Sequence, residues 1–289
     1  MFKNTAKTTI LLAAMGGLIV GIASLLGGGS SGSIMFGLLI AFAMVGWSYW
    51  SSDKLALRSA KAQVITEADH PEFYGMIRDL SQRAGLPMPR VAVSPSDQPN
   101  AFATGRNPEH AVVCATTGLL QSLSREEVEG VMAHELMHVR HRDILIGSVA
   151  AAVATAISAI AQMAMFASMF AGGRDDEDRG NPFAVLLVAM FAPMAAGLIQ
   201  MAISRSREFE ADRGAAELLR TGEPLARALE KIEAMAAQHP MQVAPAQAQA
   251  YIHNPLNEMP RKSGIDVSRL FSTHPATAER IRLLREMTF

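Results

Sequence analysis

Four long stretches without a charged residue constrain the fold of this chain more than any other feature. They cover residues 8–26, 34–50, 144–171 and 183–203. A helix rises about 1.5 Å per residue, so stretches of this length approach the hydrocarbon core of a bilayer, which is about 30 Å thick. We therefore expect four transmembrane helices and a chain that is mainly α.

Alternatives exist for three of these stretches. The first follows two lysines, as a signal peptide would, but its apolar run is longer than a signal peptide needs and a second apolar stretch follows almost at once. A retained helical hairpin is therefore favoured. The third and fourth stretches are rich in alanine and could pack inside a large protein core, although their length favours spanning.

Flanking charges predict the orientation of these helices. Basic residues lie at one end of each stretch, namely Lys3 and Lys7, then Lys54, Arg58 and Lys61, then Arg140 and Arg142, and finally Arg205 and Arg207. Basic loops remain on the cytoplasmic side of a membrane, so we expect these ends and both termini to be cytoplasmic. The chain then divides into an N-terminal hairpin (1–51), a first cytoplasmic part (52–143), a second hairpin (144–203) and a second cytoplasmic part (204–289).

The first cytoplasmic part contains a helical motif of metal-binding residue types. The sequence His134-Glu-Leu-Met-His138 lies in a predicted helix of about 17 residues, which starts with a capping box from Ser124 to Glu127. The i, i+4 spacing puts both histidines on one face, where neutral imidazoles can bind zinc, and Glu135 beside them can take a proton from water. The pattern predicts metal-dependent hydrolysis. Two exposed histidines on an amphipathic helix are the weaker alternative.

A catalytic zinc site needs a third protein ligand. Residues 204–212 open a second helix, in which Glu208 and Asp212 are separated by i, i+4 and share one face. We expect Glu208 to bind the metal and Asp212 to orient a ligand from outside the first shell of donors. Glu210 points to another face, but the sequence alone leaves it open as the ligand.

Strand patterns precede the metal-binding helix. After a predicted helix at 72–84, short apolar runs at 90–93, 101–104 and 111–115 are separated by turn residues. We expect a small antiparallel sheet at this place.

Four motifs occur in the order found in one protein family. They are Pro99-Asn-Ala-Phe-Ala-Thr-Gly105, His134-Glu-Leu-Met-His138, Ser204-Arg-Ser-Arg-Glu-Phe-Glu-Ala-Asp212 and Thr273-His-Pro275. Together with the apolar stretches they cover nearly the whole chain, which resembles the HtpX-type membrane metalloproteases, relatives of the CAAX prenyl endopeptidases. The resemblance implies a gluzincin-type protease domain, with one zinc ion per chain on His134, His138 and Glu208, and with Glu135 as general base.

The same resemblance implies a substrate-binding strand and a further catalytic group. An edge strand of the sheet would bind extended substrate through its backbone. The residues lining it would be Asn100, Ala101, Phe102 and Ala103, each of which fits an ordinary packed hairpin equally well. His274 would donate a hydrogen bond to the developing oxyanion. A histidine before Pro275 could also simply cap a C-terminal helix at 275–287.

In function, the resemblance implies a multi-pass endopeptidase of the bacterial inner membrane, acting in protein quality control and stress response. Expected partners are membrane protein substrates, cut in their cytoplasmic segments, and the lipid bilayer, with functional overlap with other membrane proteases. One alternative is a prenyl-protein endopeptidase, although related enzymes of that kind have more spans. The other is a catalytically silent membrane zinc-binding protein, and the intact Glu135 weighs against it.

Composition bears on two further points. The net charge is -1 and no basic stripe interleaved with aromatic residues appears, which argues against nucleic-acid binding. The single cysteine, Cys114, excludes an internal disulfide and fits a reducing compartment.

Overall fold

The computed structural model describes residues 29–142, 144, 207–238 and 276–289, with a few isolated positions between 13 and 24. Most of the first predicted transmembrane helix and nearly all of the third and fourth therefore lie outside the described residues, as does His274. The chain forms two compact units, which are Met1–Trp50 with Val149–Gln200, and Ser51–Ser148 with Met201–Phe289.

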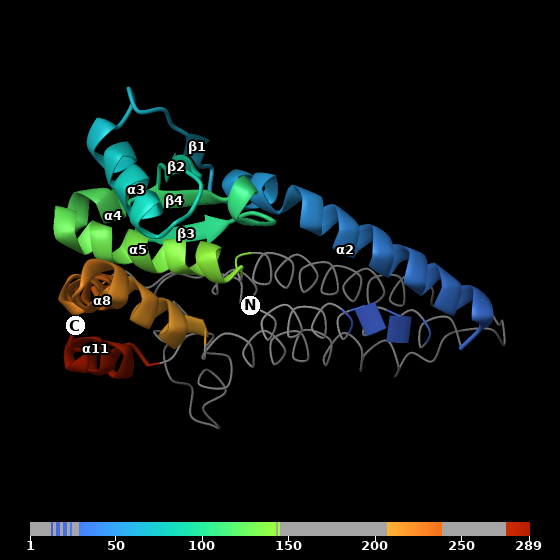
Figure 1. Cartoon of the computed structure of the whole chain (residues 1–289). Helices are drawn as coiled ribbons and strands as arrows, with labels where there is room; N and C mark the ends of the chain where they lie inside the picture. Colours follow the sequence, from blue (N-terminus) through green and yellow to red (C-terminus); the bar gives the residue numbers. More distant parts are fainter. Residues whose placement is uncertain are drawn as a thin grey trace. The chain divides into compact units, whose positions relative to one another are not determined.

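In the first unit, the described residues belong mainly to helix α2, which is Ser31–Ser59 and continues into the second unit (Figure 1). The second predicted apolar stretch, 34–50, is helical throughout. Its exposed large apolar side chains are Ile34, Met35, Phe36, Leu38, Leu39, Phe42, Trp47 and Trp50. Among the residues that the structure describes, no helix is both long and apolar enough to cross a bilayer. The four transmembrane helices stay a prediction.

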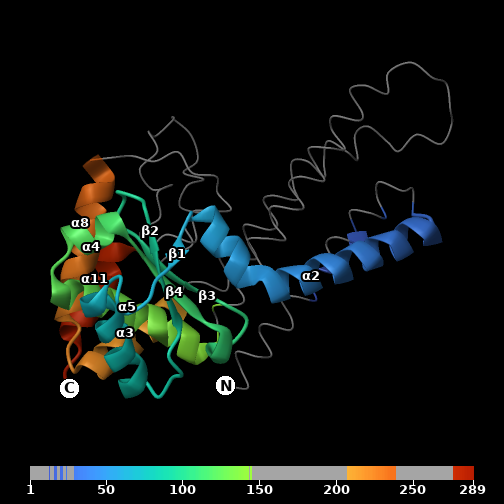
Figure 2. The same ribbon diagram turned by 90° about the horizontal axis from the view of Figure 1, so that it is seen from above.

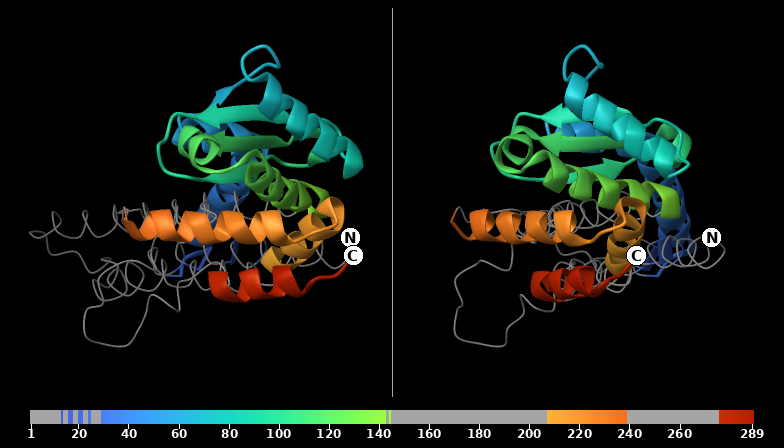
Figure 3. Two further views of the ribbon diagram at one scale, coloured as in Figure 1. Left: turned by 90° about the vertical axis from the view of Figure 1, so that its left-hand side faces the viewer. Right: turned by 60° about the vertical axis from the view of Figure 1, so that its left-hand side comes forward.

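The second unit is built in layers. A four-stranded sheet lies against α5 (Arg125–His141), α5 packs on α8 (Glu223–Gln238), and α11 (Thr277–Glu286) packs on the far side of α8 (Figure 3). Helix α3 (Pro71–Arg83) also packs on α5, and the short α4 (Thr117–Ser122) packs on the sheet. One cluster of buried apolar side chains joins these layers, so α5 lies at the centre of the unit.

The sheet is mixed, which corrects the predicted antiparallel sheet. Its strands are β1 (Gln63–Val64), β2 (Arg90–Ser94), β3 (Ala101–Thr104) and β4 (Val112–Thr116), in the order β1-β2-β4-β3 (Figure 2). Strand β4 runs parallel to β2, whereas the pairs β1–β2 and β3–β4 are antiparallel. The three predicted strands are correct to within one residue, and β1 was not predicted. A single-turn 3-10 helix, Pro108–His110, connects β3 to β4.

The loop after β2 explains the mixed pairing. Instead of turning back as a hairpin, residues 95–100 cross the end of β4 and enter β3 on its other side. The Thr116 hydroxyl, at the end of β4, accepts a hydrogen bond of 2.9 Å from the backbone N–H of Asn100. A Cβ atom at Gly118 would collide with the carbonyl oxygen of Asp97, so only glycine lets the loop pass this closely.

Helix α5 begins where the sequence predicted. The Ser124 hydroxyl accepts a hydrogen bond from the Glu127 backbone N–H, and the Glu127 carboxylate accepts one of 2.8 Å from the Ser124 backbone N–H. The helix has 17 residues, and α3 likewise matches its predicted range to within one residue. Both helices carry their start signals locally, which is why the sequence predicted them well.

A break between two helices was not predicted. The chain is helical over 207–219, Arg220 then adopts a left-handed conformation with φ 61°, and α8 starts at Glu223. A Cβ atom at Gly222 would collide with the carbonyl oxygen of Leu284 in α11. Glycine here allows α11 to approach the start of α8 closely.

Candidate metal centre

Two histidines of α5 form the first half of the site. His134 and His138 lie one helical turn apart, and their Nε2 atoms are separated by 3.1 Å. The ring planes are nearly perpendicular, at 88°. The side chain of His134 is 4% exposed and that of His138 is 17% exposed, so both rings lie largely out of water.

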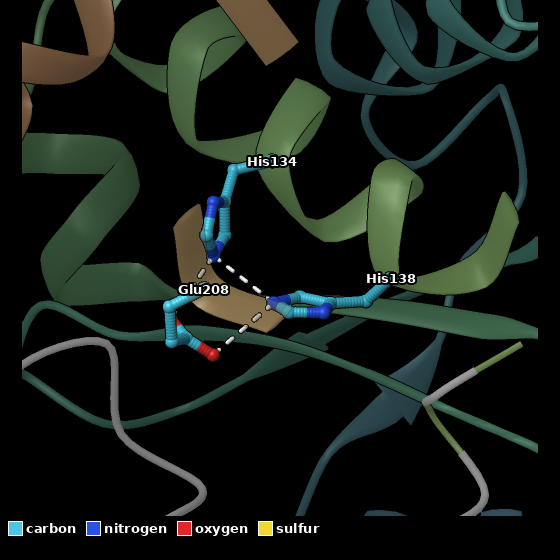
Figure 4. Close-up of side chains that lie close together, drawn as sticks. All are labelled: His134, His138 and Glu208. Carbon is cyan, nitrogen blue, oxygen red and sulfur yellow. Dashed lines mark hydrogen bonds and ion pairs between the residues drawn. The ribbon is translucent and has the colours of Figure 1, made fainter. Parts of the chain in front are cut away.

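Glu208, from the helix over 207–219, joins the two histidines (Figure 4). Its two carboxylate oxygens lie 3.6 Å from Nε2 of His134 and 3.5 Å from Nε2 of His138. Within the described residues, these three side chains form a group whose ligand atoms all lie within 4.8 Å of one another. Glu210, the alternative ligand, is exposed to solvent and is not part of this group.

The distances are close to those expected around a bound metal ion. Zinc bonds imidazole nitrogen and carboxylate oxygen at about 2.0–2.2 Å, so the ligand atoms of a tetrahedral site lie about 3.3–3.6 Å apart. The two Nε2 atoms are 3.1 Å apart, and each lies 3.5 or 3.6 Å from a different carboxylate oxygen of Glu208. With one ligand atom taken from each residue, all separations are within 4.8 Å. Two imidazoles and one carboxylate leave a fourth position for water or substrate, as in catalytic rather than structural zinc sites.

Glu135 follows the first histidine on the same buried turn of α5, and it is 6% exposed. Burial raises the pKa of its carboxyl group above the ordinary value, and the nearby Glu208 carboxylate adds to this. The two site histidines and the backbone of Ala103 act in the opposite direction without cancelling the rise. A buried glutamate with a raised pKa is suited to accept and return a proton.

Asp212 lies directly behind His134. Its Oδ1 atom is 2.9 Å from Nδ1 of His134, while Nε2 of the same ring faces Glu208. This arrangement holds a proton on Nδ1 and leaves Nε2 available to a metal. Burial opposes the charged form of His134, but hydrogen bonding to Asp212 and Glu208 outweighs it and raises the pKa of this imidazole to about 10 when no metal is bound.

The site also contains Arg280 of α11, which the sequence does not predict. Its Nε and Nη2 atoms donate hydrogen bonds of 2.8 and 2.7 Å to the two oxygens of Asp212, and its Nη1 lies 3.5 Å from Oε2 of Glu208. Burial alone would raise the pKa of Asp212, but Arg280 lowers it to about 2. Arg280 carries no recognisable local signal, because it follows Asp212 by 68 positions and belongs to no metal-binding motif.

The predicted substrate strand lies beside the site. Residues 101–103 belong to β3, which ends the sheet order among the described strands and contacts α5. Asn100 and Ala101 are buried, whereas Phe102 and Ala103 are half-buried. The backbone of Ala103 reaches the carboxylate of Glu135, which places β3 next to the expected general base.

A buried glutamate beside two helical histidines, with a carboxylate from a second helix, is an arrangement typical of metal-dependent peptidases. The chain belongs to peptidase family M48, whose sequence pattern matches residues 67–288, and it is a metalloprotease. It is 53% identical over 288 residues to proteins named "Protease HtpX homolog" from Burkholderia mallei (strain SAVP1) and Burkholderia pseudomallei (strain K96243). These alignments cover 98% of this chain and 97% of each relative.

A solved structure shares the fold. The crystal structure of S. mikatae Ste24p matches with a TM-score of 0.55 and 20% sequence identity, over 98% of this chain. The chain spans 66% of the length of Ste24p. The fold is therefore that of an M48 peptidase, mainly helical with a small mixed sheet.

Proposed function

We propose that this chain is a membrane-bound zinc endopeptidase that cuts cytoplasmic segments of membrane proteins, including misfolded ones. The observation that carries the proposal is the convergence of His134, His138 and Glu208 beside the buried Glu135. This donor set suits zinc, and its fourth position suits a hydrolase.

Each residue of the site has a separate task in peptide hydrolysis. His134, His138 and Glu208 would hold the zinc ion, which when bound lowers the pKa of water and polarises a peptide carbonyl. Glu135 would take a proton from the attacking water and return it to the departing amine nitrogen, because its carboxylate is buried beside the three residues that would hold the zinc ion. Asp212 keeps His134 in the required tautomer. His274 would assist by donating a hydrogen bond to the oxyanion.

The substrate would bind as an added strand along β3. Its backbone would pair with residues 100–103, which gives affinity with little dependence on sequence. This mode suits a quality-control protease, because misfolded segments share an exposed backbone but no common sequence. Overlap with other membrane proteases would follow from the same lack of sequence selectivity.

Membrane attachment rests on the apolar stretches and on α2. Large side chains such as Phe42, Trp47 and Trp50 are 61–85% exposed on this helix. Exposure of such apolar side chains is unfavourable in water but favourable in lipid. The flanking basic residues would place both termini and the metal site on the cytoplasmic face of a bacterial inner membrane. Substrates would then be cut close to the bilayer.

The test uses full-length protein in detergent, stripped of metal and supplied with zinc, and an unfolded protein as substrate. We expect wild type to bind one zinc ion and cleave, Glu135→Gln to bind zinc without cleaving, and Glu208→Ala to lose both properties. Glu210→Ala is the matched control and should behave as wild type, because Glu210 is exposed. Stoichiometric zinc binding without cleavage of any peptide, prenylated peptides included, would refute the proposal and favour a silent zinc-binding protein. Cleavage of prenylated peptides only would favour the prenyl-protein endopeptidase.

A further inference from the structure

Arg280 is one of the largest fully buried side chains among the described residues, and it lies against the metal site. A guanidinium is costly to bury, so its charge needs close partners. One face of the group forms a two-pronged contact with Asp212, and the remaining Nη1 atom lies near Glu208. A single cation therefore contacts both carboxylates of one helical turn.

The carboxylates need this cation as much as it needs them. Glu208 is 6% exposed and Asp212 is 2% exposed, and they are neighbours on the same helix face. Two buried negative charges repel each other and would push their side chains apart. Arg280 offsets that repulsion, and its planar fork also fixes the direction in which Asp212 points.

The orientation of the Asp212 carboxylate affects His134, because Asp212 contacts the Nδ1 side of that imidazole. Asp212 Oδ1 is shared between Nη2 of Arg280, at 2.7 Å, and Nδ1 of His134, at 2.9 Å. A shift of this carboxylate would turn the imidazole and move Nε2 away from Glu208. The contacts thus form one chain from α11 through Asp212 to His134.

We propose that Arg280 is a positioning residue for the metal, which sets the ligands His134 and Glu208 through its contacts with Asp212 and Glu208. The proposal rests on the proposed zinc site. It makes α11, which supplies no metal ligand, a necessary part of metal binding. The competing explanation is an ion pair that only stabilises the fold.

The experiment measures zinc affinity by chelator competition on full-length protein. The variants are Arg280→Lys, which keeps the charge but loses the fork, Arg280→Met, Asp212→Asn, and the double variant Arg280→Met/Asp212→Asn. The matched control is Arg282→Met, on the same helix, because Arg282 is exposed and its ion pair among the described residues is with Glu286, one turn later. Thermal unfolding of each metal-free variant shows whether it is folded. Cobalt(II), bound in place of zinc, gives an absorption spectrum that reports the geometry of the ligands.

We expect zinc binding to weaken about tenfold or more in Arg280→Met, as for other residues that orient metal ligands, with an altered cobalt spectrum. Arg280→Lys should restore part of the affinity, and Arg282→Met should match wild type. The loss in the double variant should be clearly smaller than the sum of the two single losses, because Arg280 acts largely through Asp212.

Several results would overturn the proposal. Folded Arg280 variants with wild-type zinc affinity and cobalt spectrum would leave only the fold-stabilising role, and so would strictly additive losses. If Arg280→Met does not fold, the double variant decides, since it leaves neither charge buried alone. Wild-type affinity in a folded double variant would then reject the proposal. Absence of zinc binding in wild type would instead reject the proposed function itself.

Discussion

Helix α11 carries two arginines with paired carboxylates in opposite surroundings. Arg280 is 2% exposed, and it forms a two-pronged contact with Asp212 beside Glu208. Arg285 is 43% exposed, and it bridges two glutamates of α8 with hydrogen bonds of 2.9 to 3.4 Å. The two guanidinium groups thus have similar partners and similar geometry.

The two guanidinium groups differ in their exposure to solvent. Around Arg285, solvent screens each charge and replaces a lost partner, so the contacts add little to stability. Around Arg280, a lost partner leaves a charge buried without compensation, which is expensive. The number of hydrogen bonds therefore does not predict how much an arginine contributes to stability. The burial of its charge, and the contact of its partner with a site residue, predict this contribution better.

The strongest test of this difference is Arg280→Met. Removing the guanidinium leaves the buried Asp212 and Glu208 with only the His134 imidazole between them, so we expect a loss of about 3–5 kcal/mol in the free energy of unfolding. Denaturant unfolding of the metal-free protein measures it. A loss similar to that of Arg285→Met would break the comparison.

A second test moves α11 without touching either arginine. In Gly222→Ala the new methyl group collides with the Leu284 carbonyl, so α11 must shift, and we expect a loss of about 1–3 kcal/mol. Zinc binding should weaken as well, because Arg280 moves with its helix. Gly75→Ala in α3 is the control, since its methyl group meets only an ordinary contact at 3.8 Å with Arg78. That variant should gain up to about 1 kcal/mol from helix propensity.

Glu127 is an intermediate case, because its carboxylate is buried but its partner Lys231 is half-exposed. Burial would raise its pKa, but hydrogen bonds from Lys231 and the Ser124 backbone lower it overall. A lowered folded-state pKa means that the stabilisation is complete above the unfolded value of about 4.3 and is lost as pH falls through the folded value.

The corresponding variant is Glu127→Gln, which weakens both the capping box and the ion pair. We expect it to cost about 1–2 kcal/mol at pH 7. The difference in the free energy of unfolding between wild type and Glu127→Gln should shrink as the pH falls toward the pKa of Glu127 in the folded state. Unfolding curves of both metal-free proteins between pH 7 and pH 3 measure it. A gap that stays constant with pH would show that the charge of Glu127 contributes nothing.

The smallest effect is expected for Arg285→Met. Solvent replaces the lost contacts, so the thermal midpoint should fall only slightly, and less at high salt than at low salt. Zinc affinity should be unchanged. A large, salt-independent fall would mean that Arg285 holds α11 as firmly as Arg280 does.

The sequence predicted well those parts of the molecule that depend on neighbours in the chain. The helices α3 and α5 and the capping box of α5 follow from residues a few positions apart. The grouping of His134, His138 and Glu208 was predicted from the i, i+4 spacing in two helices and from the three protein ligands that a catalytic zinc site needs. Glu208 could be preferred over Glu210 because Glu208 shares a helix face with Asp212, whereas Glu210 points to a different face.

The parts that sequence reasoning missed depend on distant contacts. Whether β4 pairs with β2 or only with β3 depends on the loop held by Thr116 and Gly118, which turn residues alone do not reveal. Gly222 and Pro224 are the local sequence signals of the break before α8. Arg280 could not be found, because its role arises only after α11 has packed against a helix formed much earlier in the chain.

The order of the chain gives the position of Arg280 a consequence during synthesis. A ribosome adds about 5–20 residues per second, so Arg280 follows Asp212, which is 68 positions earlier, after roughly 3–14 seconds. Throughout that interval the two carboxylates exist without the cation that orients them. A nascent chain therefore contains His134, His138 and Glu208 before it contains the arginine that pairs with Asp212.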